Sequence, residues 1–218
     1  MKPRSVLLAD DCALLREGVA ALLAQHPDFE VIGSTGDGRD CVRMALRDQP
    51  DVVIFDCSMH GLNGVEAARR IAEHKTRTRL VCVSTHEEPH WVRATFDAGA
   101  HGYVLKRCDF AELIEAMETV LHLRYYISRD VAHVLVDGCR SRGRPMIVDD
   151  TELSSREREI TQLFAEGHST QDIAERLYIS AKTVATHREH IMAKLGLHGI
   201  AQLTRYALRE GLTTLDLE

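Results

Sequence analysis

The sequence lacks three features, and each absence excludes a class of protein. Its six cysteines lie far apart without any C-x-x-C pair, in a chain large enough to fold without disulfides, so we interpret them as reduced thiols, mostly in the core. Its apolar runs are too short for a membrane span or a signal-peptide core, and we expect a cytoplasmic protein with no membrane partner. It also lacks an excess of positive charge, since 27 basic and 33 acidic side chains give a net charge of −6. This balance argues against a protein that coats nucleic acid or membranes by bulk attraction, so any DNA contact must be local.

The length and composition indicate an ordinary globular protein. A chain of 218 residues predicts one large domain or two modest ones and excludes a long multidomain enzyme. With 44% hydrophobic and 28% charged residues, the chain can bury a core. Its pattern changes along the chain, and we predict a first domain at residues 1–123, a linker at 124–150 and a second domain at 151–218.

In the first domain, short apolar runs alternate with helix-period stretches. This alternation predicts an α/β fold with a doubly wound, five-stranded parallel sheet. The expected strands are nearly continuous apolar runs, as in strands buried on both faces: Ser5–Asp10, Phe29–Ser34, Val52–Asp56, Arg79–Ser84 and Gly102–Leu105. The expected helices fill the gaps: Cys12–Gln25, Gly38–Asp48, Gly64–His74, Pro89–Ala98 and Asp109–Leu121. The last begins with a capping-box-like pattern formed by Asp109 and Glu112.

After the sheet, the pattern predicts helices only. A short helix capped by Ser128 is expected at Ser128–Val136, and the polar Asp137–Pro145 stretch is typical of a linker. From Thr151 onward we expect a small all-α domain in which short turns separate four helices. These helices extend from the Ser154 capping box to Glu166 and over Thr170–Leu177, Ala181–Leu195 and Gly199–Glu210.

Polar side chains gather where the predicted strands end. Asp10 and Asp11 close the first strand, Asp56 the third and Ser84 the fourth, and Lys106 follows the fifth. Ligand sites of open α/β sheets form beyond these carboxyl ends. Converging carboxylates repel one another and need a cation or a raised pKa. Mg²⁺ is the natural candidate, because this hard ion accepts carboxylates and leaves room for a phosphate oxygen. Taken alone, Asp11 is better interpreted as a helix cap, but five polar residues at strand ends of the same edge favour a site.

At these residues the chain closely resembles the receiver domain of two-component response regulators, which is flavodoxin-like. The match covers about Ser5 to Leu121 and includes Asp56-Cys-Ser-Met59 and Gly102-Tyr-Val-Leu-Lys106. The resemblance implies that Asp56 accepts a phosphoryl group from a histidine kinase. It implies a Mg²⁺ site formed by Asp10, Asp11, Asp56 and the backbone carbonyl of Ser58. It also implies that Lys106 contacts the phosphoryl group and that Ser84 and Tyr103 form the switch pair.

One position departs from the receiver pattern. Most receivers have Pro four residues after the phosphoacceptor, whereas this chain has His60, which restores a backbone N–H and frees φ. Either His60 and His86 alter the lifetime of the phosphoryl group, or both are exposed loop residues.

The second domain contains a helix, a tight turn and a second helix. Ile173, Ala174 and Leu177 share one face and Ile179 fills the turn, a pattern typical of a helix-turn-helix. On the second helix, residues 180–195 carry a net charge of +2 inside a domain of net charge −2. Ser180 is the expected N-cap of this helix. On charge alone a helical protein-docking domain explains the segment equally well, and the turn pattern favours DNA.

Leu153–Leu212 resembles the LuxR-type DNA-binding domain, through Leu153-Ser-Ser-Arg-Glu-Arg-Glu159, Ser180-Ala-Lys-Thr-Val184, His187 and Lys194-Leu-Gly196. With the receiver, the chain resembles a response regulator of the NarL/FixJ type, which implies a homodimer that binds promoter double-stranded DNA and acts with RNA polymerase. The resemblance implies base contacts from Ala185, Thr186 and Glu189, and phosphate contacts near Lys182, Thr183, Arg188 and Lys194. From base-edge chemistry, Glu189 accepts from cytosine.

Two other interpretations belong to different classes. A Mg²⁺-dependent phosphatase with an Asp nucleophile would need an acid two residues after Asp56, where this chain has Ser58. A receiver with a protein-docking tail would not bind DNA. His187 and His190 lie one turn apart, but no further ligand completes a zinc site. We therefore expect a regulator that is not an enzyme.

Overall fold

The computed structural model describes residues 2–59, 61–133 and 153–213. His60, the Asp137–Pro145 stretch and the last residues of the helix expected at Ser128–Val136 lie outside these ranges. The chain divides into two compact units, Met1–Arg140 and Ser141–Glu218, and each is described by itself. No helix within the described ranges is both long and apolar enough to span a membrane.

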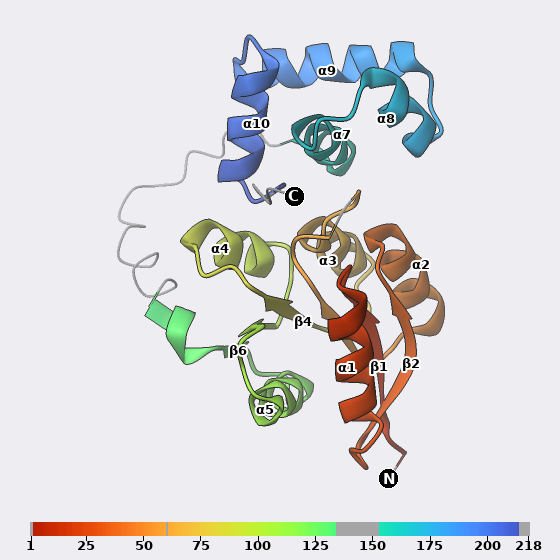
Figure 1. Cartoon of the computed structure of the whole chain (residues 1–218), viewed down its shortest axis with the longest axis vertical. Helices are drawn as coiled ribbons and strands as arrows, with labels where there is room; N and C mark the ends of the chain where they lie inside the picture. The colour runs from red at the N-terminus through yellow and green to blue at the C-terminus, as the bar shows by residue number, and fades with distance from the viewer. Residues whose placement is uncertain (1, 60, 134–152, 214–218) are drawn as a thin grey trace. The chain divides into compact units, whose positions relative to one another are not determined.

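The first unit is a parallel sheet whose strands alternate with helices (Figure 1). The strands are β1 (Arg4–Ala9), β2 (Phe29–Thr35), β3 (Val52–Phe55), β4 (Arg79–Ser84), β5 (Gly102–Leu105) and β6 (Tyr126–Ile127). The helices between them are α1 (Ala13–Leu23), α2 (Gly38–Asp48), α3 (Gly64–Glu73), α4 (Pro89–Asp97) and α5 (Phe110–Leu121). The strand order is β2-β1-β3-β4-β5-β6, which confirms a doubly wound α/β fold.

Both faces of the sheet are covered, and alternate residues of one strand pack into different cores. Leu7 and Ala9 of β1 join the core that packs against α2, α3 and α4. Val6 and Leu8 join the core beneath α1 and α5. Because both faces are buried, the strands read as continuous apolar runs. This is why their ends fall within one residue of the predicted positions.

The sheet has a sixth strand that the sequence analysis missed. In β6, Tyr126 pairs with Gly102 and Ile127 with Tyr103, parallel to β5. Two residues are too few to show strand periodicity. The residues after β6 begin a short helix at 129–133, as expected.

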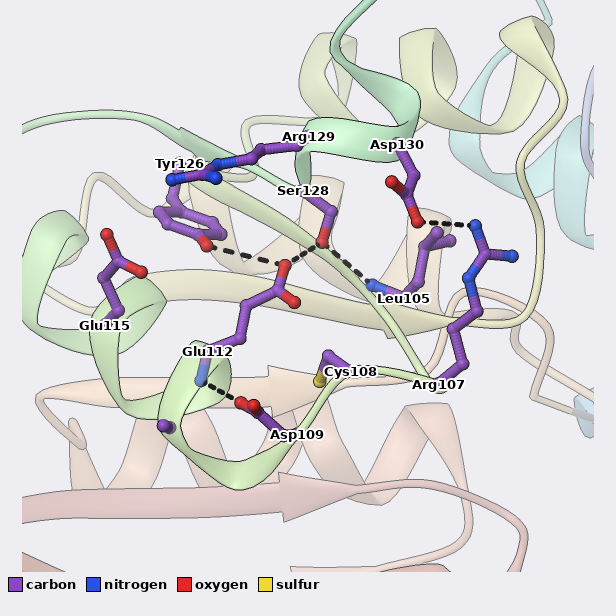
Figure 2. Close-up of a pocket in the computed structure, with 11 residues that line it drawn as sticks. Leu105, Arg107, Cys108, Asp109, Glu112, Glu115, Tyr126, Ser128, Arg129 and Asp130 are labelled. Atoms are coloured by element: carbon purple, nitrogen blue, oxygen red, sulfur yellow. Dashed lines mark hydrogen bonds and ion pairs between the residues drawn. The ribbon is translucent and has the colours of Figure 1, made fainter.

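The expected capping box of α5 is only half formed. Asp109 accepts from the backbone N–H of Glu112 at 2.8 Å. The Glu112 carboxylate instead accepts from the hydroxyls of Ser128 at 2.5 Å and Tyr126 at 3.5 Å (Figure 2). These groups line a cavity of about 450 Å³ beside α5 that includes no carboxylate of the strand-end cluster. A tertiary contact has therefore replaced the local one.

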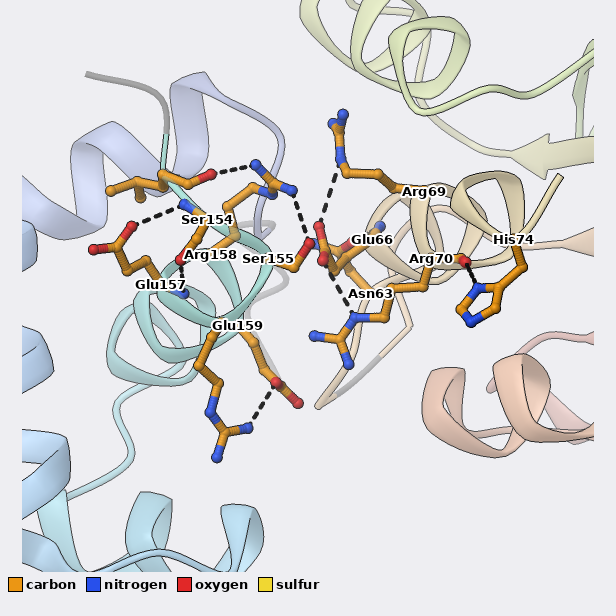
Figure 3. A network of polar contacts seen from close by, with 12 residues as sticks. Asn63, Glu66, Arg69, Arg70, His74, Ser154, Ser155, Glu157, Arg158 and Glu159 are labelled. Atoms are coloured by element: carbon orange, nitrogen blue, oxygen red, sulfur yellow. Dashed lines mark hydrogen bonds and ion pairs between the residues drawn. The ribbon is translucent and has the colours of Figure 1, made fainter. Parts of the chain in front are cut away.

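The second unit consists of α7 (Ser155–Ala165), α8 (Thr170–Leu177), α9 (Ala181–Leu195) and α10 (Ile200–Arg209). Ser154 and Glu157 form the predicted capping box of α7 (Figure 3). Ile173, Leu177, Val184 and Ile191 lie in one apolar core, and Ile179 packs against it from the turn. The helix-turn-helix pattern is thus confirmed as α8, turn and α9.

Candidate functional site

The strand ends of the first unit bring three carboxylates together. Asp10 follows β1, Asp56 follows β3, and one ligand oxygen from each of Asp10, Asp11 and Asp56 lies within 4.8 Å of the others. Asp10 and Asp56 are buried, whereas Asp11 is exposed. Lys106, which follows β5, places its Nζ 2.9 Å from Oδ2 of Asp10 and 2.9 Å from Oδ2 of Asp56. All five residues predicted at the strand ends therefore lie at one edge of the sheet, and four of them, all except Ser84, form the charged cluster.

Burial and the neighbouring charges shift the pKa values of Asp10 and Lys106. It raises the pKa of Asp10, because a charged carboxylate is poorly solvated there, and the hydrogen bond and charge of Lys106 oppose the rise. Burial also acts to lower the pKa of Lys106, but the charges of Asp56 and Asp10 outweigh it and the pKa is raised. Lys106 is thus a permanent cation between two carboxylates.

The backbone around Asp56 is closely packed. Ser58 donates its N–H to Oδ1 of Asp56 at 3.3 Å, and its hydroxyl lies 3.3 Å from Oδ2. Helix α3 begins at Gly64, where an added Cβ would lie 1.8 Å from the carbonyl oxygen of Asp56. Asn63 caps this helix by accepting from the N–H of Glu66 at 2.7 Å, and Glu66 lies between Arg69 and Arg70 (Figure 3). Because any side chain at position 64 would clash with the Asp56 carbonyl oxygen, the close approach of α3 to Asp56 requires glycine there.

The predicted switch residues meet at the backbone of His86. Ser84 Oγ accepts from the N–H of His86 at 3.0 Å, and the Tyr103 hydroxyl donates to the carbonyl of the same residue at 2.8 Å. Both side chains are fully buried, and burial raises the pKa of Tyr103 well above its usual range. The His86 ring stacks on Trp91 of α4 at 4.6 Å. The interpretation of His86 as an exposed loop residue does not agree with the structure, because its side chain is partly buried.

The donor set fits a hard divalent cation. Carboxylate oxygens are the ligands that Mg²⁺ prefers, and it usually retains several waters. The exposed Asp11 lets solvent reach that side of the cluster. Asp10, Asp11 and Asp56 could therefore hold a metal ion. The alternative reading of Asp11 as the helix cap is not observed, because the N-cap of α1 is Cys12 and Cys12 donates its N–H to Asp10 at 2.8 Å.

The second candidate surface lies on α9. Its N-cap is Ser180, which accepts from the N–H of Thr183 at 3.0 Å. Six of the seven side chains predicted to contact DNA are exposed: Lys182, Thr183, Ala185, Thr186, Arg188 and Glu189. The seventh, Lys194, is partly buried and places its Nζ 3.3 Å from the Glu157 carboxylate of α7. Lys194 therefore holds two helices of its own unit together.

Two contacts beside the acidic cluster were not predicted. Arg16 of α1 donates to the backbone carbonyl of Asp10. The Cys57 sulfur lies 3.0 Å from the Ser84 hydroxyl. The position of Cys57 directly after Asp56 was the only signal in the sequence, and it did not reveal which way the thiol points.

Comparison with known proteins agrees with the division of the chain into two units. Residues 6–118 match the response regulator receiver domain, and residues 151–207 match the bacterial regulatory proteins of the luxR family. The chain is 33% identical to the oxygen regulatory protein NreC of Staphylococcus epidermidis, over 95% of this chain and 98% of NreC. It is 34% identical to the transcriptional regulatory protein LiaR of Bacillus subtilis, with the same coverage of 95% and 98%.

A solved structure is similar over both units. RcsB of Salmonella enterica serovar Typhimurium, bound to a promoter in the presence of the phosphomimetic BeF3−, is 25% identical with a TM-score of 0.60, and the match covers 95% of this chain and 99% of RcsB. Together with the receiver fold and the helix-turn-helix unit, these matches show that the chain belongs to the NarL/FixJ-type response regulators of two-component systems, which are DNA-binding regulators of transcription.

Proposed function

We propose that Asp56 is the residue that accepts a phosphoryl group from a histidine kinase, and that this modification controls promoter binding. The observation that carries the proposal is the position of Lys106, whose Nζ lies 2.9 Å from both Asp56 and Asp10 within the carboxylate cluster. A cation in this place can pair with a phosphoryl oxygen as readily as with a carboxylate oxygen.

The chemistry proposed for the site is phosphoryl transfer by displacement. A carboxylate oxygen of Asp56 forms the new bond to phosphorus while the P–N bond of the kinase phosphohistidine breaks, and the imidazole leaves. Lys106 and the N–H of Ser58 stabilise charge on the transferred group, and Ser84 supplies a hydroxyl donor. Bound Mg²⁺ would supply positive charge to the acids and the phosphoryl oxygens, held by Asp10, Asp11, Asp56 and the carbonyl of Ser58.

For the output, we propose that the chain binds promoter DNA as a homodimer in the cytoplasm and acts on RNA polymerase. The exposed side chains of α9, headed by Lys182 and Thr183, support this proposal. A two-fold dimer presents two such helices to half-sites about one helical turn apart. The phosphatase alternative is not favoured, because Ser58 occupies the position that its proton donor would need.

The test compares the parent with Asp56→Asn. We expect a small acyl phosphate with Mg²⁺ to phosphorylate the parent and not the variant, as measured by intact mass. We expect DNA affinity, measured by fluorescence anisotropy on genomic fragments recovered by footprinting, to rise on phosphorylation of the parent only. The exposed Asp48→Asn is the matched control and should behave as the parent does. An unmodified parent, or flat DNA affinity, would contradict the proposal.

A further inference from the structure

The residue after the phosphoacceptor candidate contacts the switch hydroxyl. Phe55 of β3 pairs with Cys82 of β4, and the same parallel register continued by two residues sets Cys57 opposite Ser84. Both side chains are completely buried, and the Cys57 sulfur lies 3.0 Å from the Ser84 hydroxyl oxygen. The contact joins the end of the strand that carries Asp56 to the end of its neighbour.

The contacts of the Ser84 hydroxyl show which way it points. It lies 3.0 Å from the Cys57 sulfur, it accepts from the backbone N–H of His86 at 3.0 Å, and the Tyr103 side chain is its third neighbour. The Asp56 carboxylate has other partners, namely Lys106 and Ser58. Within the described part of the chain, no hydrogen bond joins Ser84 to Asp56. To reach a phosphoryl group on Asp56, the Ser84 hydroxyl must give up the Cys57 contact.

We propose that Cys57 is a positioning residue that holds Ser84 in a resting orientation and so slows phosphoryl transfer to Asp56. The inference rests on the proposed function of Asp56. A thiol is a weak hydrogen-bond partner, so it biases the hydroxyl without locking it. Because the pair is buried, water does not compete for either group. Only the fraction of molecules in which Ser84 has left Cys57 is competent, and the observed rate scales with that fraction.

Substitutions of Cys57 can strengthen or weaken its hold on the Ser84 hydroxyl. Cys57 also lies near the buried Cys82 of β4, whose pKa is raised chiefly by burial and further by Cys57. Cys57→Ser keeps the shape and supplies a stronger partner. Cys57→Ala and Cys57→Val both remove the partner, although one leaves a gap and the other adds volume. An effect common to Ala and Val therefore comes from loss of the sulfur contact and not from packing.

The experiment measures the rate at which a small acyl phosphate with Mg²⁺ phosphorylates Asp56 in the full chain. We expect Cys57→Ser to lower this rate and both Cys57→Ala and Cys57→Val to raise it, each by about fivefold, the change that one neutral hydrogen bond produces. Thermal unfolding of each variant identifies any that does not fold, and the remaining apolar variant then decides the sign. If Ser and the apolar variants move the rate in the same direction, or leave it unchanged, the proposal is wrong.

A second series separates positioning from general structural damage. The same three substitutions are made in a Ser84→Ala background, where Cys57 has no hydroxyl to hold. We expect their effects on the rate to disappear there. Equal effects in both backgrounds would overturn the role of Cys57 while leaving Asp56 as the phosphoacceptor. Failure of the parent to become phosphorylated would instead overturn the proposed function itself.

Discussion

The two candidate sites differ in how their side chains are held. In the receiver unit, Asp10 contacts both Lys106 and the N–H of Cys12, and Asp56 contacts Lys106 and Ser58. On α9, six of the seven predicted DNA contacts are exposed, and the hydroxyls of Thr183 and Thr186 form hydrogen bonds within the first turns of the helix. Covalent chemistry needs groups that are positioned beforehand, whereas a groove-reading face is ordered by the DNA that it meets. The following predictions test this contrast.

The largest effect is expected at Gly64, where the receiver site depends on close backbone packing. An added Cβ would lie 1.8 Å from the Asp56 carbonyl oxygen, so either α3 or the Asp56 segment must move. We expect Gly64→Ala to lower the free energy of unfolding by about 3 kcal/mol, as measured by urea denaturation. Gly18→Ala is the control. A Cβ added at Gly18 in α1 would meet no atom within 4 Å beyond its own stretch of helix, so this substitution should be neutral or stabilising.

The next largest effect is expected at Lys106. Lys106→Met removes the cation that lies 2.9 Å from each of two buried carboxylates. Because Lys106 opposes the rise in the pKa of Asp10, that pKa should rise further in the variant. We expect the phosphorylation rate to fall by about a hundredfold, the usual cost of losing one charge-stabilising donor. Lys75→Met, at an exposed position of the same unit, should retain the parent rate.

A smaller effect distinguishes two lysines of the second unit. Lys182 is exposed on α9, so Lys182→Ala should weaken binding to all DNA sequences and reduce the salt slope by about one, with unchanged stability. Lys194 contacts Glu157 at 3.3 Å, so Lys194→Ala should lower the free energy of unfolding by up to about 1 kcal/mol. Equal losses of stability in the two variants would remove the distinction.

The last effect is one of pH and is expected at His101, which lies at the opposite end of β5 from Lys106. Burial lowers the pKa of His101 from its usual 6.5 to about 4, helped by Arg79, and its Nδ1 accepts from the N–H of Leu80 at 3.2 Å. The unfolded chain therefore binds the proton more strongly, and stability should fall as the pH drops from 6.5 towards 4. Thermal unfolding across this range should show a weaker dependence in His101→Gln. The exposed His133→Gln should leave the dependence unchanged.

The sequence predicted most of the fold because both kinds of element carry strong local signals. Apolar runs located β1 to β5, and caps such as Ser154 and Ser180 located the helices of the second unit. It did not predict β6, whose two residues depend on pairing with β5. Nor did it predict that Glu112 would contact Ser128, sixteen residues away, in place of its own helix terminus.

The same limit applies to the candidate site. The rule that parallel strands end at one edge of the sheet was enough to bring Asp10, Asp56 and Lys106 together. The contact between Cys57 and Ser84 depends on the register of β3 against β4, which no local pattern encodes. Likewise, the exposure of Lys182 followed from helical periodicity, while the pairing of Lys194 with Glu157 required knowing how α7 packs on α9.

The short edge strand β6 has a mechanical consequence. Ile127 pairs with Tyr103, the N–H of Ser128 donates to the carbonyl of Tyr103, and the Ser128 hydroxyl accepts from the N–H of Leu105 one residue before Lys106. The segment that leaves the sheet is thus hydrogen-bonded to β5, the strand that carries the predicted switch residue Tyr103 and is followed by Lys106. A displacement of β5 by even a fraction of an ångström would therefore move β6 and Ser128 with it. The displacement would reach the segment after the sheet directly, without the movement of a helix.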